Sequence, residues 1–556
     1  MKFCRFNVLA LAFLCASGIT FSQSLDADAP SHGVKSAAEM DREWQDSVAK
    51  FNARRARILA ELDLQAGAGP YHADWETLHI DIPQWYQDAK FGIFIHWGVF
   101  SVPASQNEWY PRNMYQQKDP AYAEHIKRFG PQDSFGYKDF IPRFKAEKWE
   151  PADWARLFKE AGARYVIPVA EHHDGFALYA SDLSDWTAAK MGPKRDLIGD
   201  LEKAVRAEGL HFGTSFHRAE HDWFFDGGRS FRSDVNDPKY ASLYGPAHTW
   251  LSDPQQMLLN DWTYVSPQFA DDWLARAGEI VEKYHPEVMY FDWWAGQPNY
   301  RRNMTRFAAF YYNYAAQHGI SGVINIKDYA LNWNAGARDF ERGLRTDIEP
   351  RHFQTDTSIS NWSWGYLEHD QFKSPDFIVH QLIDIVSKNG NLLLNIGPRP
   401  DGTIPDEVRH TLLAVGAWLK QNGEAIYDTT PWKVYGEGPT KVQPGFGHDI
   451  DTQPYTAGDF RFTQKGNTVY AIEMAWPSDG RAVIHALGSK QQGNGLEITN
   501  VTLLGSEGKL EFHQTNDALE VQLPARPAGK GTAQVQDGGL VAGYALALRI
   551  ETRTEP

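Results

Sequence analysis

The chain has 556 residues, and its 71 acidic and 55 basic side chains give a formal net charge of −16. This length exceeds that of one ordinary domain, so we expect two folded units, a large core domain and an accessory module. The negative charge repels phosphate backbones and anionic membrane surfaces, and we therefore expect no nucleic-acid partner. The 20 tryptophans suit carbohydrate-binding pockets, although ordinary cores also use such rings.

Residues 1–22 have the order of a secretory signal peptide. Lys2 and Arg5 come first, an apolar run follows from 8 to 15, and a small-residue stretch ends this segment. The apolar run is too short for a stable membrane span. We expect cleavage near Gln23, export to the periplasm or the medium, and no membrane span in the mature chain.

Both cysteines, Cys4 and Cys15, lie inside this N-terminal segment. The mature protein should therefore contain no disulfide and no thiol nucleophile. Acylation of Cys15, as in a lipoprotein, is a minor alternative, because that modification normally needs a small residue just before the cysteine and Leu14 stands there.

The rest of the chain divides into three regions. Residues 23–72 form a helical lead-in, because the stretch 36–65 is charged, rich in Ala, Arg, Glu and Leu, and free of Gly and Pro. In residues 73–428 apolar strand-like runs alternate with helical patterns, which predicts βαβ units around a parallel sheet. Residues 429–556 show period-two alternation with frequent turn residues, which predicts an antiparallel β-sandwich.

Seven strand-like runs can be located in the middle region. They are GIFIHWG (92–98), YVIPVAEHH (165–173), HFGTSFH (211–217), VMYFD (288–292), GVINIK (322–327), FQTDTS (353–358) and NLLLNIG (391–397). Clear helical patterns lie between them, at 196–208, 270–284 and 376–388. Seven strands with an eighth missed fit an α/β fold, a (β/α)8-like (TIM) barrel. No GxGxxG turn follows any strand, which weakens a doubly wound nucleotide-binding alternative.

The C-terminal region contains seven short alternating runs. They are FRFTQ, TVYAIEMAW, RAVIHAL, LEITNVTLL, LEFHQ, LEVQLP and YALALRI. We expect this sandwich to support the barrel, since nothing in it gathers acids and exposed rings. Carbohydrate binding is the alternative.

Polar side chains gather where the barrel strands end. His96, His172, His173, His217, Asp292 and Lys327 stand at the C-terminal ends of successive predicted strands. In a (β/α)8 enzyme the active site lies at this face, so these side chains should share one pocket. Adjacent side chains on a strand face opposite ways, so His172 and His173 serve one pocket only if the strand twists or ends there.

The run VMYFDWW (288–294) delivers one carboxylate, Asp292, at a strand end and two indole rings directly after it. An acid beside tryptophans suits a pocket that binds a sugar ring and attacks its anomeric carbon. The alternative is structural, because strands often end in Asp where the next loop needs a turn or a helix cap.

Hydrolysis of a glycosidic bond by two carboxyl groups needs a nucleophile or base and a proton donor, about 5–5.5 Å apart in a retaining enzyme. Asp292 can fill one role. The candidates for the other are Asp328, Asp339, Glu341, Asp347 and Glu349. We choose Glu341 in the phrase DFERG, with Asp339 and Glu349 as fallbacks, since a long loop can place any of them over a pocket.

The histidines are also possible metal ligands. However, no third and fourth ligand follow at zinc-like spacing, and no His-Glu-x-x-His motif is present. Neutral imidazole offers one donor and one acceptor, which suits sugar hydroxyls. We therefore expect neither a metal nor another cofactor.

Seven phrases in the same order resemble the α-L-fucosidases of glycoside hydrolase family 29. They are KFGIFIHWGVFSVPA (90–104), NEWY (107–110), EHHDGFALY (171–179), GPKRDLIGDL (192–201), YFDWW (290–294), SWGY (363–366) and NLLLNIGPRPDGTIP (391–405). The resemblance covers about residues 75–435. It implies a (β/α)8-like barrel followed by a β-sandwich, and retaining hydrolysis through a covalent fucosyl-enzyme intermediate.

The resemblance also implies roles for single residues. Asp292 resembles the family nucleophile, and Glu341 matches the proton donor by its position after an Asp-Phe pair. His96, Glu108, His172 and His173 resemble contacts to sugar hydroxyls, and Trp109 and Trp293 resemble apolar walls beside the C5 methyl group. Lys327 stands where some members present an arginine, and His217 where many have a tyrosine.

The function that follows is exo-acting removal of terminal α-L-fucose from oligosaccharides or glycoconjugates. Two alternatives stay open: an exo-glycosidase for a related L-galacto-configured sugar, and a fucose-binding protein that has lost its chemistry. A periplasmic transport receptor fits less well, because two similar α/β lobes are not visible. The sequence does not reveal the linkage cleaved, the natural aglycone or the oligomeric state.

Overall fold

The computed structural model describes residues 35–250, 264–327, 329–445, 449, 454–492, 495–525 and 544–554. The expected signal peptide and both cysteines lie outside these residues. Within the described ranges, no helix combines the length and the apolar character needed to cross a membrane.

Eight parallel strands form a closed barrel, in which β1 pairs with both β2 and β8. The strands are β1 (Phe91–Ile95), β2 (Tyr165–Glu171), β3 (His211–Phe216), β4 (Val288–Phe291), β5 (Val323–Ile326), β6 (Ala337–Asp339), β7 (Phe353–Ser358) and β8 (Gly390–Ile396). Almost every strand residue is buried, as expected when a parallel sheet is covered on both faces. The predicted barrel is confirmed.

The strand missing from the seven predicted runs is β6. It has only three residues, and its sequence Ala-Arg-Asp contains no apolar run. Strand β6 nevertheless pairs with β5 and β7 and closes the gap between them. The described residues between β5 and β6, and between β6 and β7, contain no helix, so this side of the barrel is (β/α)8-like rather than regular.

Six helices follow the other strands and cover the barrel. They are α6 (Pro151–Glu160), α7 (Leu197–Ala207), α9 (Pro267–Tyr284), α10 (Pro298–Gln317), α11 (Pro375–Ser387) and α12 (Asp406–Asn422). Helix α7 begins at the N-cap Asp196, and α9 at the N-cap Ser266, each of which accepts a bond from a backbone N–H of the first turn. Shorter helices are α3 (Gln84–Ala89), α4 (Tyr110–Asn113), α5 (Pro120–Phe129) and α8 (Ala241–Tyr244).

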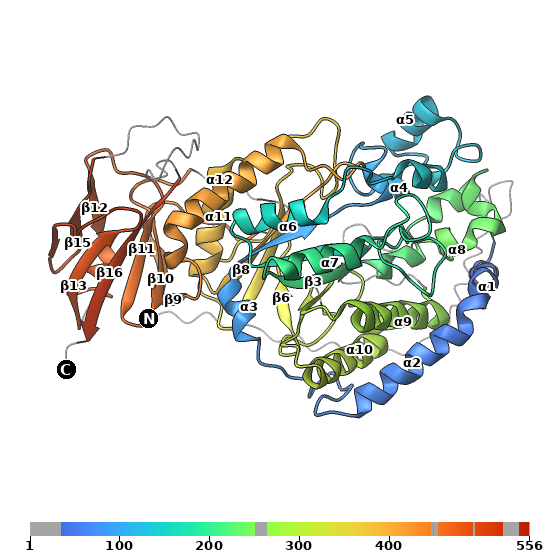
Figure 1. The fold of residues 1–556 in the computed structure, drawn as a ribbon, viewed down its shortest axis with the longest axis horizontal. Coiled ribbons are helices and arrows are strands. Elements are labelled where there is room, and N and C mark those ends of the chain that lie inside the picture. Colours follow the sequence, from blue (N-terminus) through green and yellow to red (C-terminus); the bar gives the residue numbers. More distant parts are fainter. Residues whose placement is uncertain are drawn as a thin grey trace, which may run out of the picture.

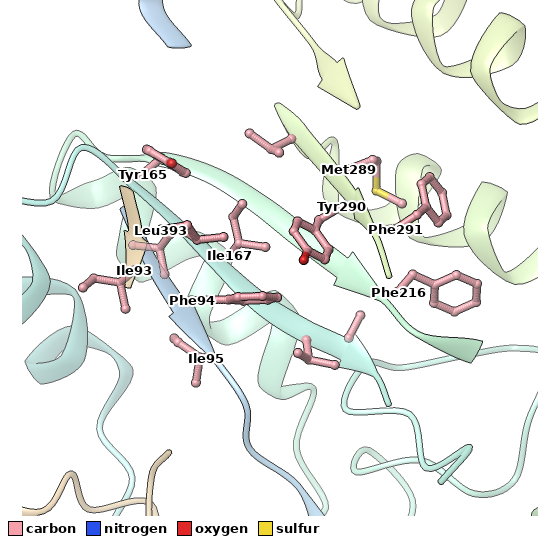
Figure 2. Close-up of a cluster of buried hydrophobic side chains, with 14 of the residues drawn as sticks. Ile93, Phe94, Ile95, Tyr165, Ile167, Phe216, Met289, Tyr290, Phe291 and Leu393 are labelled. Atoms are coloured by element: carbon pink, nitrogen blue, oxygen red, sulfur yellow. The ribbon is translucent and has the colours of Figure 1, made fainter. Parts of the chain in front are cut away.

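Aromatic and aliphatic side chains of the barrel strands are buried in one cluster (Figure 2). Phe94 of β1 and Tyr290 of β4 lie side by side there, with ring centroids 4.9 Å apart. Because strand side chains alternate, residues two positions farther along point the same way. His96 and Asp292 therefore stand directly above this aromatic layer, at the C-terminal rim.

The N-terminal part of the described chain is helical. Helix α1 (Ala37–Val48) starts with a capping box between Ser36 and Glu39, and α2 (Asn52–Gly67) follows it. Helix α2 packs against α9 and α10, on the outside of the barrel (Figure 1). The two helices extend the barrel surface rather than forming a separate core.

The C-terminal part is an antiparallel β-sandwich, as predicted. Its sheets have the orders β13-β16-β11-β10-β9 and β12-β15-β14. The strands are β9 (Thr430–Glu437), β10 (Phe460–Lys465), β11 (Thr468–Glu473), β12 (Arg481–Ile484), β13 (Leu496–Leu503), β14 (Phe512–Gln514), β15 (Leu519–Gln522) and β16 (Leu546–Thr554). Strand β9 was not among the predicted runs, because it is a half-buried edge strand that carries charged residues.

The sandwich lies against α11 and α12 at one end of the barrel (Figure 1). Arg461 of β10 donates to the buried Asp384 of α11 at 2.7 Å. Trp418 of α12 donates its indole N–H to the carbonyl of Ala545 at 2.9 Å. Buried polar contacts of this kind fix the two parts relative to each other.

Candidate active site

A cavity of about 280 Å³ opens at the C-terminal ends of the barrel strands. Its lining consists of Phe94, His96, Glu108, Trp109, His172, His173, His217, Glu220, Asp292, Trp293, Trp294, Lys327, Glu341, Asp356 and Trp364. All ten site residues predicted from the sequence are in this set. The structure thus brings together every predicted position, from the ends of six strands and from the loop after β1.

Asp292 follows β4 and is held by donors on both sides. Lys327, which follows β5, contacts its Oδ1 at 3.0 Å, and His217, which follows β3, donates from Nδ1 to its Oδ2 at 2.9 Å. Burial opposes ionisation, but Lys327 and His217 outweigh it, so the pKa of Asp292 lies well below its ordinary value. Asp292 is therefore an oriented carboxylate in a largely closed pocket.

Glu341, two residues beyond β6, shows the opposite behaviour. Its Oε2 accepts from Lys327 at 2.8 Å and from the indole N–H of Trp293 at 2.5 Å. Burial raises the pKa of Glu341; Lys327 lowers it, but the carboxylates of Asp356 and Asp292 raise it again. A carboxyl group in this setting keeps its proton to higher pH than a free glutamate.

The two carboxyl groups share one cation. Because Lys327 Nζ lies 3.0 Å from Asp292 and 2.8 Å from Glu341, the two contacted oxygens are at most about 5.8 Å apart, the sum of these distances. Retaining glycosidases place their carboxyl groups about 5–5.5 Å apart, and inverting ones about 6.5–9.5 Å. The bound on the separation thus matches the retaining geometry.

The other acids of this region lie elsewhere. Asp339 is buried within the barrel, where its Oδ2 accepts from Gln354 at 2.6 Å, and it does not line the cavity. Glu349 is paired with Arg345 at 2.5 Å and is also outside the cavity. Asp347 is exposed, and Asp328 lies outside the described residues.

The histidines present acceptors to the cavity. His96 Nδ1 contacts Asn395 Oδ1 at 2.8 Å, and the amide nitrogen of Asn395 donates to the carbonyl of Trp364, so the amide oxygen must face the ring. His173 Nδ1 contacts the carbonyl of His217 at 3.0 Å. Both rings therefore carry their proton on Nδ1, which leaves Nε2 as an acceptor for a hydroxyl group.

The histidine pair serves a single pocket. Strand β2 ends at Glu171, so the alternation of a regular strand no longer separates His172 from His173, and their ring centroids lie 4.1 Å apart. Burial, together with the neighbouring His217, lowers the pKa of His173 to about 3. Burial likewise holds the pKa values of His172 and His96 well below the ordinary value. These rings stay neutral near neutral pH.

Glu108 anchors the opposite wall. Its Oε2 accepts from the backbone N–H of Trp364 at 2.8 Å and from the hydroxyl of Ser363 at 3.0 Å. Trp364 lines the cavity, so Glu108 both holds this ring in place and exposes a carboxylate to a bound molecule.

Two sets of side chains have the proximity needed for a metal ion: His96, His172 and His217, and His173, His217 and Asp292. His217 belongs to both sets. Its Nδ1 bonds Asp292, and its Nε2 is in close contact with the Ser215 hydroxyl, so a metal would displace one of these bonds. The lysine ammonium beside Asp292 also disfavours a second cation there.

A sequence model of the α-L-fucosidase family matches residues 58–424. The chain belongs to this family, glycoside hydrolase family 29. A model of the α-L-fucosidase C-terminal domain matches residues 453–535. The protein is thus a glycoside hydrolase, and its barrel and sandwich correspond to the two parts that the family models describe.

Individual relatives agree with this assignment. The chain is 32% identical to rat tissue α-L-fucosidase over 85% of this chain and 93% of the relative. It is 32% identical to human plasma α-L-fucosidase over 77% of this chain and 85% of the relative. The crystal structure of Thermotoga maritima α-fucosidase in complex with a mechanism-based inhibitor superposes with a TM-score of 0.68 at 30% identity, covering 87% of this chain and all of that one.

Sequence reasoning missed five lining residues of this fucosidase-family enzyme: Phe94, Glu220, Trp294, Asp356 and Trp364. Asp356 lies 3.3 Å from Lys327 and accepts from the Tyr290 hydroxyl at 2.8 Å. The sequence contained a signal for Asp356, because it is a charged residue within a predicted barrel strand. A charged side chain in a strand that is buried on both faces needs a polar partner.

Glu220 is the least expected of these residues. It lies in a short 3-10 helix after β3 (Arg218–Asp222), and its Oε2 has no hydrogen-bond partner among the described residues. Nδ1 of the neutral His173 ring lies 3.4 Å from this oxygen. Burial, reinforced by Asp292, raises the pKa of Glu220 well above its ordinary value. The protonated form of this side chain is therefore favoured at the cavity wall.

Proposed function

We propose that the protein is an exo-acting retaining α-L-fucosidase that removes terminal α-L-fucose from oligosaccharides or glycoconjugates. The observation that carries this proposal is the pair Asp292 and Glu341, which share Lys327 but have pKa shifts of opposite sign. One ionised and one protonated carboxyl group on the same cavity is what double displacement requires.

In the first step, Asp292 attacks the anomeric carbon while Glu341 protonates the departing glycosidic oxygen. Lys327 and Trp293 both donate to Oε2 of Glu341, so we assign the transferred proton to Oε1. In the second step, the ionised Glu341 takes a proton from water, and the resulting hydroxide attacks the anomeric carbon. The ester bond to Asp292 breaks, fucose leaves, and both carboxyl groups return to their starting states.

The remaining cavity residues suit a deoxy sugar. Neutral His96, His172 and His173 present acceptors or donors for ring hydroxyls, and Glu108 adds a carboxylate. Trp109 and Trp293 offer apolar faces on which a C5 methyl group can rest, in place of a hydroxymethyl group that would need polar partners. A cavity of about 280 Å³ that opens at one end of the barrel suits a single terminal sugar ring, which supports exo action.

The nucleophile is tested with Asp292→Gly. Removal of the attacking carboxylate should lower kcat/KM on an aryl α-L-fucoside by about 10³-fold or more. Azide can enter the vacated space, so it should restore turnover and yield fucosyl azide. Asp347→Gly is a matched control, because Asp347 is an exposed acid outside the cavity. Near-normal activity of Asp292→Gly would show that another group attacks.

The acid is tested with Glu341→Ala on two substrates. General acid catalysis contributes about 10²–10⁴-fold, but only where the leaving oxygen needs a proton. An alkyl α-L-fucoside should therefore lose much more activity than 4-nitrophenyl α-L-fucoside. Glu349→Ala is the control. Equal losses of Glu341→Ala on both substrates would show that another group protonates the departing oxygen.

The N-terminal sequence supports export. Basic residues, an apolar run and a small-residue stretch follow one another in residues 1–22. We propose that cleavage near Gln23 releases the enzyme into the periplasm or the medium. N-terminal sequencing of the enzyme purified from cells of its source tests this; a mature chain that retains residues 1–22 contradicts it.

A further inference from the structure

A single carboxylate from the segment between β9 and β10 reaches the barrel next to the active site. Asp449 has a side chain that is only 13% exposed. Its Oδ1 accepts from the hydroxyl of Thr357 at 2.8 Å and from the amide of Gln381 at 3.2 Å. Its Oδ2 pairs with Arg342 at 3.0 Å and with Lys373 at 2.9 Å. All four partners belong to the barrel.

This residue lies between the two regions that the family models match, 58–424 and 453–535. Neither region contains it, and Asp449 does not line the cavity. Its contacts nevertheless resemble those of a specific carboxylate-binding site, because two cations and two neutral donors converge on this one side chain.

Arg342 connects Asp449 to the proposed acid. It directly follows Glu341, and its guanidinium lies 4.9 Å from the ring centroid of Trp364, which lines the cavity. The backbone of Arg342 has φ = 47°, a left-handed conformation that is unfavourable for a residue with a Cβ. The backbone N–H of Arg342 donates to the carbonyl of Asp356 at 2.8 Å, and its side chain adds the ion pair with Asp449.

The other partners adjoin the cavity as well. Thr357 follows Asp356 on β7. Lys373 donates to the carbonyls of Ser358 and Ser360, at 2.5 and 3.1 Å, at the start of the loop that carries Trp364. Asp449 therefore ties together the turn after β6, the end of β7 and the loop after β7.

We propose that Asp449 is a positioning residue for the general acid, which holds Arg342 and thereby the turn that presents Glu341 to the glycosidic oxygen. This inference rests on the proposed role of Glu341. It gives the C-terminal half of the chain a part in the reaction, since the barrel alone does not supply this carboxylate. The residue acts through Arg342 and not by touching substrate.

The effect should depend on the leaving group. A displacement of about 1 Å can cost 10²-fold when a step needs exact geometry. Asp449→Ala should therefore lower kcat/KM on an alkyl α-L-fucoside by about 10- to 100-fold. The same variant should lose less than about threefold on 4-nitrophenyl α-L-fucoside, because that leaving group needs little protonation. Each kcat/KM value reports only the first step. The ratio of the values for the two substrates does not depend on the concentration of folded enzyme, so a loss caused by partial unfolding cancels in it.

Asp449→Asn covers the case in which the alanine variant does not fold. It keeps the side-chain volume and one acceptor oxygen but removes the charge, so a smaller selective loss is expected. Thermal unfolding shows which variants are folded, and Asp449→Glu, which restores the charge, should recover part of the selective loss.

Glu424→Gln is the matched control. Glu424 pairs with Arg549 at 3.0 Å and accepts from Tyr470 at 2.8 Å, so it also joins the barrel to the sandwich, but away from the cavity. It should show no dependence on the leaving group. Equal losses on both substrates for Asp449→Ala and Asp449→Asn, or a selective loss for Glu424→Gln, would overturn the inference.

The same assay separates this inference from the proposed function. If Glu341→Ala itself shows no selective loss, then the assignment of the acid fails, and with it the basis of the inference. If Glu341→Ala loses activity selectively but both Asp449 variants do not, only the role of Asp449 is refuted.

Discussion

Lys327 is the cation that contacts both proposed catalytic carboxyl groups, and the effect of its replacement by Met can be calculated. The ammonium is buried and contacts Asp292 at 3.0 Å, Glu341 at 2.8 Å and Asp356 at 3.3 Å. At an effective dielectric constant of about 20, two unit charges 3.0 Å apart attract by roughly 5 kcal/mol. Even a third of this energy corresponds to about one pKa unit.

The signs follow from the state that each carboxyl group needs. Lys327 lowers the pKa of Asp292 and also opposes the rise in the pKa of Glu341. Its loss should raise both pKa values. Asp292 must be ionised to attack, so the acid limb of the pH profile of kcat/KM moves to higher pH, by about one unit or more. Glu341 must be protonated, so the alkaline limb moves to higher pH as well.

The assay is the pH dependence of kcat/KM on an aryl α-L-fucoside, whose limbs report the free enzyme as a coupled system. Lys327→Arg keeps the charge, so both limbs should stay close to their wild-type positions. Removal of one partner from a buried ion pair costs about 3–5 kcal/mol, and thermal unfolding must show that Lys327→Met is still folded. A folded Lys327→Met with unmoved limbs would refute this electrostatic reasoning.

Three further predictions concern single side chains. Glu220→Gln should lose less than about fivefold in kcat/KM, because an amide resembles the protonated acid and the loss of one hydrogen bond costs about 1 kcal/mol. A loss as large as that of Glu220→Leu would contradict this prediction. Glu108→Gln should raise KM by about 3- to 10-fold with little change in kcat, because the side chain that holds Trp364 in the cavity wall loses its charge. An unchanged KM would count against this. Burial lowers the pKa of His248, but its ion pairs with Asp222 and Asp41 outweigh burial and raise it. That stabilisation is fully present below the unfolded pKa of about 6.5 and disappears as the pH rises through the higher folded value. His248→Gln should therefore lower the melting temperature, and this decrease should be larger at acid than at alkaline pH, by an amount on the order of 1 °C. A decrease that does not depend on pH would exclude the charged pair.

The barrel was predictable because its strands are buried on both faces and read as apolar runs. Strand β6 is the exception, since its three residues Ala-Arg-Asp are held in place by pairing with β5 and β7 and not by their own apolar character. Strand β9 was missed for a related reason: at the edge of a sheet, one side is free to carry polar residues. In both cases tertiary contacts, and not local pattern, define the strand.

The strand-end rule accounts for most of the site. His96, His217, Asp292 and Lys327 follow their strands directly, so position in the chain was enough to gather them at one face. The sequence offered Glu341 as one of several acids in the connections around β6. These connections contain no helix among the described residues, so no local pattern shows which acid points into the cavity. Contacts distant in sequence decide it.

The order of the barrel strands sets the order of the charged groups around the rim, and this explains why two carboxyl groups that share Lys327 have pKa shifts of opposite direction. Around the rim, β3 to β7 present His217, Asp292, Lys327, Glu341 and Asp356 in turn. Asp292 is flanked by two donors, so its ionised form is favoured. Glu341 stands between the same lysine and a second carboxylate, so its protonated form is favoured over that of an ordinary glutamate. Because adjacent parallel strands cannot exchange places, the proposed roles of Asp292 and Glu341 follow from the order of the strand ends.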